Sequence, residues 1–216
     1  MNILMFANDP TIFIEGTPAR RRMEQYAAMF RELHVVGVTH EQWRAPSRHG
    51  SLFLYPATGR GHIARRRALY PLGKKVCEDT VVDVITVQSS DELGIIAFFL
   101  AQKFDIPLQL QIHADILNPR YRRTSLKDRI RYYIATWLIP KAQCIRVVSE
   151  RIKRSLITSK LVRLESQITV LPIFTDIAGF LIEQPEMETR QKLQEYQFKI
   201  IAVGRYMNKE KNFSML

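Results

Sequence analysis

The feature that most constrains the fold of this chain is a regular alternation of short apolar runs with longer segments of helical character. Several of the runs are almost continuous in Val, Ile and Leu, which is typical of strands that are buried on both faces. Strands are predicted at 2–6, 35–39, 51–55, 83–88, 107–113, 143–148, 168–171 and 198–203. Such alternation predicts an α/β fold with a doubly wound, mainly parallel sheet.

Two of the intervening helices begin at capping signals. Ser89 with Glu92, and Ser125 with Asp128, occupy the positions of a capping box ahead of apolar residues at helical spacing. One face of the second helix carries Leu126, Ile130, Tyr133, Ile134 and Trp137. We expect this face to pack against the core. The alternative is that the aromatic residues of this helix lie at a membrane interface.

The alternation of strands and helices breaks once, after the run at 168–171. The segment that follows is polar, contains proline and shows no strand pattern until residue 198. We therefore expect an N-terminal domain at 1–176, a linker at 177–197 that ends in a short helix, and the first strand and loop of a second domain at 198–216. A single strand cannot bury its own faces, so this second domain is expected to be truncated.

The charge of the chain favours anionic partners. Lys and Arg total 32 against 21 Asp and Glu, a net charge of +11, which suits nucleic acid, lipid headgroups or phosphorylated substrates. Arginines cluster at 20–22, at 65–67 and between 120 and 131. The alternative interpretation of each cluster is an ordinary solvated face.

Cysteine usage and the N-terminus point to a cytoplasmic protein. Cys77 and Cys144 are isolated, which suits a reducing compartment and excludes a C-x-x-C zinc site. No apolar run approaches the roughly 20 residues of a membrane span, and the first residues lack the features of a signal peptide. No metal or other cofactor is expected.

Two short segments could bind an anion. Thr17 followed by Pro18 predicts a helix start, Gly16 lets the backbone come close to a ligand, and arginines in the first turns oppose the helix dipole unless an anion binds there. The alternative is an exposed basic turn. Near the end of the chain, Arg205 and Lys211 flank a loop after a predicted strand and could clamp a diphosphate.

Two further segments carry candidate polar residues. His113 lies at the carboxyl end of a predicted strand, where open α/β sheets place their ligands, and Asp115 is two residues further on. A lone histidine can equally be structural, and both interpretations stay open. Ser149 precedes a helix that has Glu150 in its first turn, and capping alone explains the serine.

The order of these features resembles that of the family 4 (group 1) glycosyltransferases, which have the GT-B fold. The segments that carry the resemblance are "RVVSERIKRSL", "ITVLPIFTDIAGF" and "IIAVGRYMNKEKNF". The sequence departs from the family pattern in having one glycine, Gly16, where a double-glycine loop is usual. Phe174 and Thr175 stand where the family usually has Asn-Gly, and no E-x₇-E segment occurs before Leu216.

The resemblance implies two facing Rossmann-like domains and a nucleotide-sugar donor held mainly by the second. It implies that Gly16, Arg205 and Lys211 contact the donor diphosphate and that His113 is catalytic, beside the transferred sugar. The residues expected on the acceptor or sugar side are Thr17, Asp115 and Glu150.

The function expected from this resemblance is transfer of a sugar from a nucleotide-sugar to a lipid-linked or polysaccharide acceptor in cell-envelope glycan synthesis. The basic clusters would meet an anionic membrane surface at the inner face of the plasma membrane, and the 216-residue chain itself is expected to be inactive. One alternative is a domain that binds glycan or lipid without turnover. Another is a basic nucleic-acid-binding protein, although no RNA-binding signature is present and nucleic acid is not the expected partner.

Overall fold

The computed structural model describes all of the chain except residues 40–44, 163, 174–186, 195 and 199–216. In the described part, eight strands form one sheet in the order β3-β4-β2-β1-β5-β6-β7-β8. The strands are β1 (Asn2–Ala7), β2 (Glu32–Val38), β3 (Ser47–His49), β4 (Leu52–Ala57), β5 (Val84–Val87), β6 (Leu108–Ile112), β7 (Cys144–Val147) and β8 (Ile168–Val170). All neighbouring strands pair in parallel except β3 and β4, which are antiparallel.

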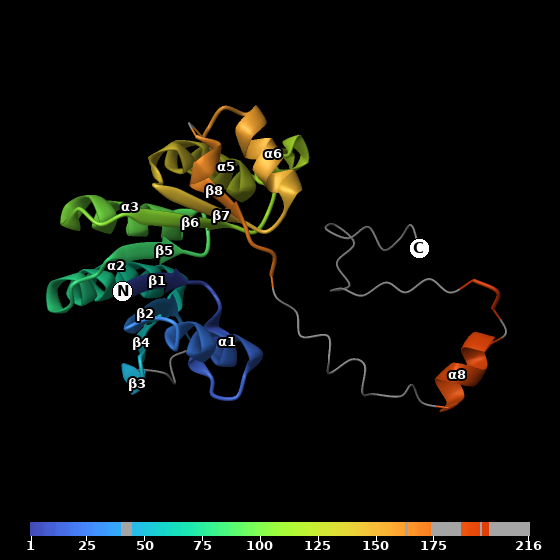
Figure 1. The fold of residues 1–216 in the computed structure, drawn as a ribbon, viewed down its shortest axis with the longest axis horizontal. Helices are drawn as coiled ribbons and strands as arrows, with labels where there is room; N and C mark the ends of the chain where they lie inside the picture. Colours follow the sequence, from blue (N-terminus) through green and yellow to red (C-terminus); the bar gives the residue numbers. More distant parts are fainter. Residues whose placement is uncertain (40–44, 163, 174–186, 195, 199–216) are drawn as a thin grey trace. The chain divides into compact units, whose positions relative to one another are not determined.

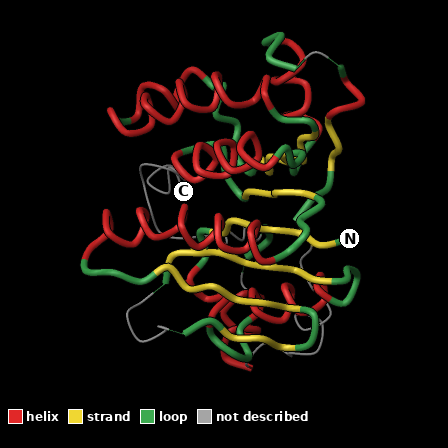
Figure 2. Tube along the Cα trace, turned by 90° about the vertical axis from the view of Figure 1, so that its left-hand side faces the viewer, coloured by secondary structure: helices red, strands yellow, loops and turns green. Residues whose placement is uncertain are grey.

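Helices connect the parallel strands and run alongside them (Figure 1, Figure 2). The α-helices of the first unit are α1 (Pro18–Ala27), α2 (Gly61–Asp79), α3 (Glu92–Phe104), α4 (Pro119–Thr124), α5 (Leu126–Leu138) and α6 (Glu150–Thr158). Short 3-10 helices are η1 (Pro10–Phe13), η2 (Ile139–Lys141) and η3 (Glu165–Gln167). No described helix combines the length and the apolar character that crossing a bilayer requires.

The sheet has a separate core on each face. Side chains of α2, α3, α5 and α6 share one core with alternate residues of the central strands, such as Phe6, Ile85 and Leu110. The opposite face of β1, β2 and β4 packs against η1 and α1, where Met23 is fully buried. This two-sided cover explains the continuous apolar runs of the sequence, because a strand buried on both faces has no polar side.

The helix α2 lies between two predicted strands, where the alternation placed a helical segment, although its own residues give a weak helical signal. It contains three arginines, Pro71 and Gly73, so it lacks a clear apolar period and contains two helix breakers. Gly73 is required by packing: a Cβ added there would lie 2.5 Å from Phe6 Cζ and 2.8 Å from Leu100 Cδ1. The missing side chain therefore lets α2 approach the sheet and α3 closely.

Seven of the eight predicted strands are confirmed, with ends shifted by a few residues. The eighth prediction, at 198–203, lies outside the described residues apart from Phe198. The strand β3 was missed because its three residues, all exposed, carry no apolar signal. The start of α3 was placed wrongly: Asp91, not Ser89, caps it, by accepting the backbone N–H of Leu93 at 3.1 Å.

The expectation for the apolar face of α5 is wrong. Leu126, Ile130, Tyr133 and Trp137 are exposed, and the helix instead buries Ala135 and Leu138. The reason is close packing on α3, because a Cβ on Gly94 would collide with the side chain of Leu138. The predicted cap holds: Ser125 Oγ accepts the Asp128 N–H at 3.1 Å.

The chain divides into two compact units, Met1–Ile173 and Phe174–Leu216. The first unit contains the whole sheet. In the second unit the described elements reduce to α8 (Met187–Gln194), which falls where the short helix of the linker was expected. The expected domain boundaries at 176 and 198 border residues outside the described part and stay predictions.

Candidate functional site

The carboxyl ends of the parallel strands lie at one edge of the sheet, and the loops after β5 and β6 form a pocket there. Its volume is about 130 Å³. The pocket is lined by Gln88, Ser89, Ser90, Asp91, Gln111, Ile112, His113, Ala114, Ile116, Tyr121 and Arg131. Open α/β sheets bind their ligands outside the carboxyl ends of their strands, so this pocket is the candidate functional site.

His113 follows β6 directly and is an exposed residue, not an enclosed core residue. Enough protein surrounds its ring that loss of solvent lowers the pKa of His113 below its ordinary value of 6.5, and the charges of Arg146 and Arg22 lower it further. The imidazole is therefore neutral at neutral pH. A neutral ring can accept a hydrogen bond from a hydroxyl through one nitrogen and donate one through the other.

A chain of side-chain hydrogen bonds crosses the sheet beneath His113. Thr86 Oγ1 of β5 donates to Gln109 Oε1 at 2.8 Å and accepts from Gln111 Nε2 at 2.9 Å. Arg146 Nη1 of β7 then donates to Gln111 Oε1 at 3.1 Å. This ladder fixes the guanidinium near His113. The ladder was not predicted from the sequence, although the Gln-x-Gln spacing in "LQLQI" is a visible signal, since alternate strand residues share a face.

The wall of the pocket opposite the β6 loop is held by Asp91. Its Oδ1 accepts from Ser89 Oγ at 2.7 Å and caps α3, while its Oδ2 lies 3.4 Å from Arg131 Nη2 of α5. Arg131 also approaches Glu92, with 3.6 Å between Nε and Oε2. Neither Asp91 nor Arg131 was predicted as a site residue, because an aspartate near a helix start and a helical arginine are common without any function.

Anion binding at the start of α1 stays a prediction, and the structure shows the backbone and the cap of this segment. Gly16 has φ of +76°, and nothing lies within 4 Å of a Cβ built on it, so the backbone is open to a ligand at this point. Thr17 caps α1 by accepting the Arg20 N–H at 3.2 Å, and its Oγ1 lies 2.7 Å from Thr11 O. Arg20 does not face this loop, because its side chain is buried and bonds Glu24 at 2.6 Å.

Asp115 has structural partners in the described chain. Its Oδ1 accepts from Ser155 Oγ of α6 at 3.1 Å, and its Oδ2 lies 3.9 Å from Arg151 Nε. These contacts tie the loop after β6 to α6. Ser149 caps α6 as expected, and Glu150 is exposed in its first turn. The sugar-side roles of Thr17, Asp115 and Glu150 stay predictions.

The structure brings some of the predicted site residues together and leaves others apart. His113 lines the pocket, whereas Gly16, Thr17, Asp115 and Glu150 do not. Arg22 of α1 has a small share in lowering the pKa of His113, after loss of solvent and the charge of Arg146. Arg205 and Lys211 lie outside the described residues. Within the described part, no group of three side chains is arranged to hold a metal ion.

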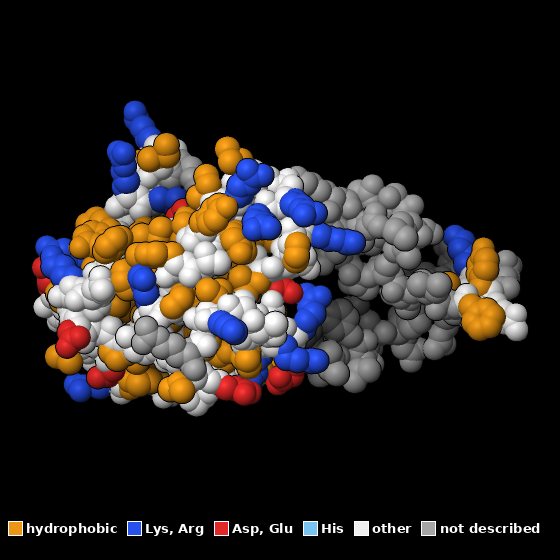
Figure 3. Space-filling model, turned by 90° about the horizontal axis from the view of Figure 1, so that it is seen from above, with side chains coloured by type: hydrophobic (Ala, Val, Ile, Leu, Met, Phe, Trp, Pro, Cys, Tyr) orange, Lys and Arg blue, Asp and Glu red, His pale blue; other side chains and the backbone are white. Residues whose placement is uncertain are grey.

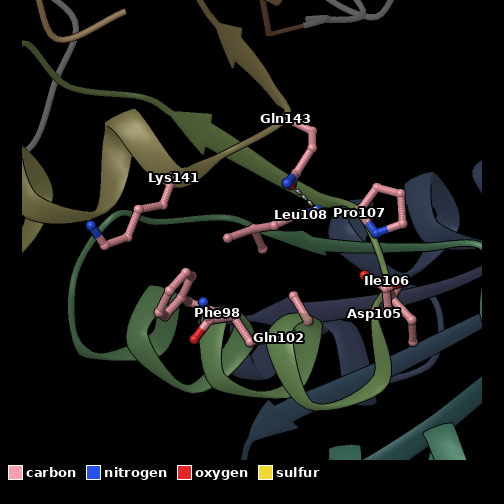
Figure 4. Close-up of a pocket in the computed structure, with 9 residues that line it drawn as sticks. Phe98, Gln102, Asp105, Ile106, Pro107, Leu108, Lys141 and Gln143 are labelled. Atoms are coloured by element: carbon pink, nitrogen blue, oxygen red, sulfur yellow. Dashed lines mark hydrogen bonds between the residues drawn. The ribbon is translucent and has the colours of Figure 1, made fainter.

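A larger pocket, of about 590 Å³, lies at the opposite edge of the sheet (Figure 4). Phe98 and Gln102 enter it from α3, and Lys141 enters it from η2. At its rim the Leu108 N–H donates to Gln143 Oε1 at 2.8 Å. This edge carries the amino ends of β6 and β7, so the smaller pocket beside His113 is the better candidate despite its size.

Comparisons with solved structures agree with this architecture. The structure of Anabaena "Alr3699/HepE in complex with UDP and glucose" has a TM-score of 0.53 and 14% identity, with 90% of this chain and 50% of that chain covered. The lipopolysaccharide outer core galactosyltransferase WaaB has a TM-score of 0.50 and 12% identity, with 87% of this chain and 50% of that chain covered.

A different enzyme class shares the fold. UDP-GlcNAc 2-epimerase from Methanocaldococcus jannaschii has a TM-score of 0.50 and 13% identity, with 78% of this chain and 44% of that chain covered. The chain thus spans about half the length of these structures, and identities this low show the fold alone. Comparison with curated proteins by sequence returned no match.

The family is shown by a match that extends over most of the first unit. Residues 15–173 match the family model described as "Glycosyl transferase 4-like domain". The matched region begins just before Gly16 and includes every helix and strand from α1 to β8, with the pocket beside His113. The chain therefore belongs to the glycosyl transferase 4-like domain family.

Proposed function

We propose that this chain forms the acceptor-side half of an enzyme that transfers a sugar from a nucleotide-sugar to a lipid-linked or glycan acceptor. The observation that carries the proposal is the position of His113. It lies at the carboxyl edge of the sheet, in a pocket, within the region that matches the family. The structures of related fold that were solved with UDP and glucose, or with UDP-glucose, support a nucleotide-sugar as the donor.

In this proposal His113 lies beside the transferred sugar. A neutral imidazole suits that place, because it can exchange hydrogen bonds with sugar hydroxyls without adding positive charge near Arg22 and Arg146. The open backbone at Gly16 gives the donor diphosphate a contact, and Arg205 and Lys211 supply its counter-charge. Most of the donor site belongs to the second domain. Residues 1–216 alone are therefore proposed not to transfer sugar.

The proposed setting is the inner face of an anionic membrane in cell-envelope glycan synthesis. The net charge of +11 supports this setting, because basic surfaces are drawn to anionic leaflets. A second candidate function is binding of a lipid or glycan without turnover. The exposed apolar side chains of α5 favour it, since they offer a binding surface that needs no donor.

The test is nucleoside diphosphate release by the complete protein that carries this chain, assayed with a set of nucleotide-sugars and membrane-extracted acceptors. We expect turnover with one donor. His113→Ala should reduce it about a hundredfold, the usual loss when one preorganised hydrogen-bonding group is removed from the reacting centre. His49→Ala, an exposed histidine on β3, is the matched control and should leave turnover unchanged.

The same assay tests the donor clamp and the second candidate. Arg205→Ala or Lys211→Ala should each cost about 2–4 kcal/mol of transition-state stabilisation in the complete protein. Equal turnover in His113→Ala and the parent would overturn the role of the histidine. Saturable acceptor binding with no release of nucleoside diphosphate from any donor would favour binding without turnover.

A further inference from the structure

A stripe of large apolar side chains runs along the outer face of α5. Leu126, Ile130, Tyr133 and Trp137 are 72%, 51%, 59% and 43% exposed. Their spacing of four, three and four residues puts them on one side of the helix. Scattered apolar residues on a surface need no explanation, but a continuous helical stripe of four does.

The stripe continues toward α3 through contacts between aromatic rings. Trp137 meets Phe98 edge to face, with 5.0 Å between ring centroids, and Phe98 contacts Phe99 at 5.6 Å. Phe99 is itself half exposed. Figure 3 views the side of the molecule on which α5 and α6 lie in Figure 1, and it shows broad hydrophobic areas with Lys and Arg side chains projecting around them.

A basic hollow borders the stripe at its N-terminal half. Arg122 and Arg123 of α4 and Arg129 of α5 line a depression of about 290 Å³ together with Tyr133. All three arginines are exposed. Among the described residues none of the three has a carboxylate within ion-pair distance, whereas Arg131 on the same helix is paired with Asp91 and Glu92. Arg122 instead lies over the ring of Tyr132, 5.3 Å from its centroid.

We propose that the surface formed by Leu126, Ile130, Tyr133 and Trp137 with Arg122, Arg123 and Arg129 is the docking face for an anionic phospholipid bilayer. We call it the α5 face. The inference rests on the membrane setting of the proposed function and names the surface responsible. The apolar stripe enters the boundary between headgroups and acyl chains, and the three guanidinium groups bind headgroup phosphates.

The composition of the α5 face fits this occupant in each part. Tyr and Trp have an apolar body and a polar tip, which suits the headgroup level of a bilayer. Lys141, whose ammonium lies 4.6 Å from the Trp137 ring centroid, adds a cation at the other end of the stripe. The lysine and arginine stems can lie along apolar surface while their charges reach phosphate oxygens.

Two other occupants fit less well. A second copy of the chain bound symmetrically through this face would bring two sets of unpaired arginines together, and like charges at an interface oppose association. Single-stranded nucleic acid needs flat rings on which bases stack. Leu126 and Ile130 provide none, and the rings of Tyr132 and Tyr133 are turned 77° from each other.

The experiment is flotation of residues 1–216 with vesicles of phosphatidylcholine alone or of phosphatidylcholine mixed with phosphatidylglycerol. We expect binding to the mixed vesicles, weakened by salt, and little binding to phosphatidylcholine alone. The triple variant Arg122→Gln, Arg123→Gln, Arg129→Gln should bind roughly a hundredfold more weakly, the product of about a fivefold contribution from each cation near an anionic surface.

The matched control removes the same charge elsewhere. Arg31, just before β2, Arg67 of α2 and Arg154 of α6 are exposed, and their triple change to Gln should leave binding near that of the parent. Leu126→Gln with Ile130→Gln tests the stripe without touching a charge, and glutamine keeps the helix propensity. This double variant should also weaken binding more than tenfold, with far-UV circular dichroism unchanged.

A spectroscopic readout reports which surface enters the bilayer. The chain has two tryptophans, so Trp43→Phe leaves Trp137 as the reporter, and its emission should shift to shorter wavelength on mixed vesicles. An equal loss of vesicle binding in the two triple arginine variants would overturn the assignment of the α5 face as the docking surface. Vesicle binding without a shift in Trp137 emission would overturn it too. Binding to single-stranded RNA but not to vesicles would overturn it as well. None of these readouts requires sugar transfer, so failure of the proposed function would be recognised separately.

Discussion

Arg146 Nη1 on β7 donates a hydrogen bond to Gln111 Oε1 on β6 at 3.1 Å, and the same guanidinium bonds the backbone oxygen of Leu171 at 3.2 Å. The arginine thus links β6 and β7 to the segment after β8. Gln111 is buried and lies two residues before His113. The contact therefore holds a positive charge in a fixed place near the candidate catalytic ring.

The pKa of His113 should reflect this fixed charge. We expect the ring to titrate below its ordinary value of 6.5, because loss of solvent disfavours the imidazolium and Arg146 and Arg22 repel it. Removing the charge with Arg146→Met should raise the midpoint. The measurement is the pH dependence of the His113 ring signals in NMR spectra of residues 1–216.

The control for this titration is Arg146→Lys, which keeps the positive charge and should keep the pKa of His113 low. Because the folded pKa lies below that of the unfolded chain, the unfolded state binds the proton first, and stability falls as the pH drops through 6.5. A midpoint at or above 6.5 in the parent, or one that Arg146→Met does not change, would contradict the electrostatic account.

Gly73→Ala tests the contact of α2 with the core. Alanine normally favours a helix by about 1 kcal/mol over glycine. Here its Cβ would lie 2.5 Å from Phe6 Cζ, so we expect a net loss of roughly 1–3 kcal/mol of unfolding free energy through overpacking. Urea unfolding measures this change in unfolding free energy. Lys75→Ala on the exposed side of α2 is the control, and its unfolding free energy should stay within about 0.5 kcal/mol of the parent. A Gly73→Ala variant more stable than the parent would contradict the expected overpacking and show that the core rearranges to accept the methyl group.

Glu92 should make stability depend on acid pH. Burial alone would raise its pKa, but its own backbone N–H, Arg131 and Arg66 together lower it below 4.5. Stability from this carboxylate is therefore present above 4.5 and is lost as the pH falls through the folded-state pKa. Glu92→Gln should reduce the unfolding free energy near neutral pH and make less difference in acid. Urea unfolding at several pH values measures this difference. An equal difference in unfolding free energy between Glu92→Gln and the parent at every pH, or no difference, would contradict the role of the Glu92 carboxylate.

Much of the fold could be predicted because its signals are local. The strands of the central sheet are apolar runs too short for helices, and three of the helices begin at Ser or Thr caps that the structure confirms, at Thr17, Ser125 and Ser149. The failures also have physical causes. The helix α5 buries Ala135 and Leu138, and Gly94 leaves room for the Leu138 side chain, whereas a sequence pattern cannot show which of two apolar faces a neighbouring helix will contact.

The candidate site could be predicted less completely. His113 was found because the end of a strand is visible in sequence. Asp91, Arg131 and Arg146 were not, since their proximity to the pocket depends on the order of strands and on the packing of α5 against α3. Arg20 shows the opposite error: its place in an arginine cluster suggested exposure, but it lies on the side of α1 that faces the sheet.

Thr17 allows a structural role to be separated from a role toward the sugar. Its hydroxyl accepts the Arg20 N–H and approaches two backbone oxygens, of Thr11 and Ile14, at 2.7 and 2.9 Å. Thr17→Ala removes the cap and should cost about 1 kcal/mol of unfolding free energy. Thr17→Ser retains the hydroxyl and should be close to the parent in urea unfolding.

If Thr17→Ser also retained sugar transfer in the complete protein, capping of α1 would account for the residue. A loss of transfer in Thr17→Ser at parental stability would instead assign its methyl group to the acceptor or sugar side. Equal stability of the alanine and threonine forms would contradict the cap.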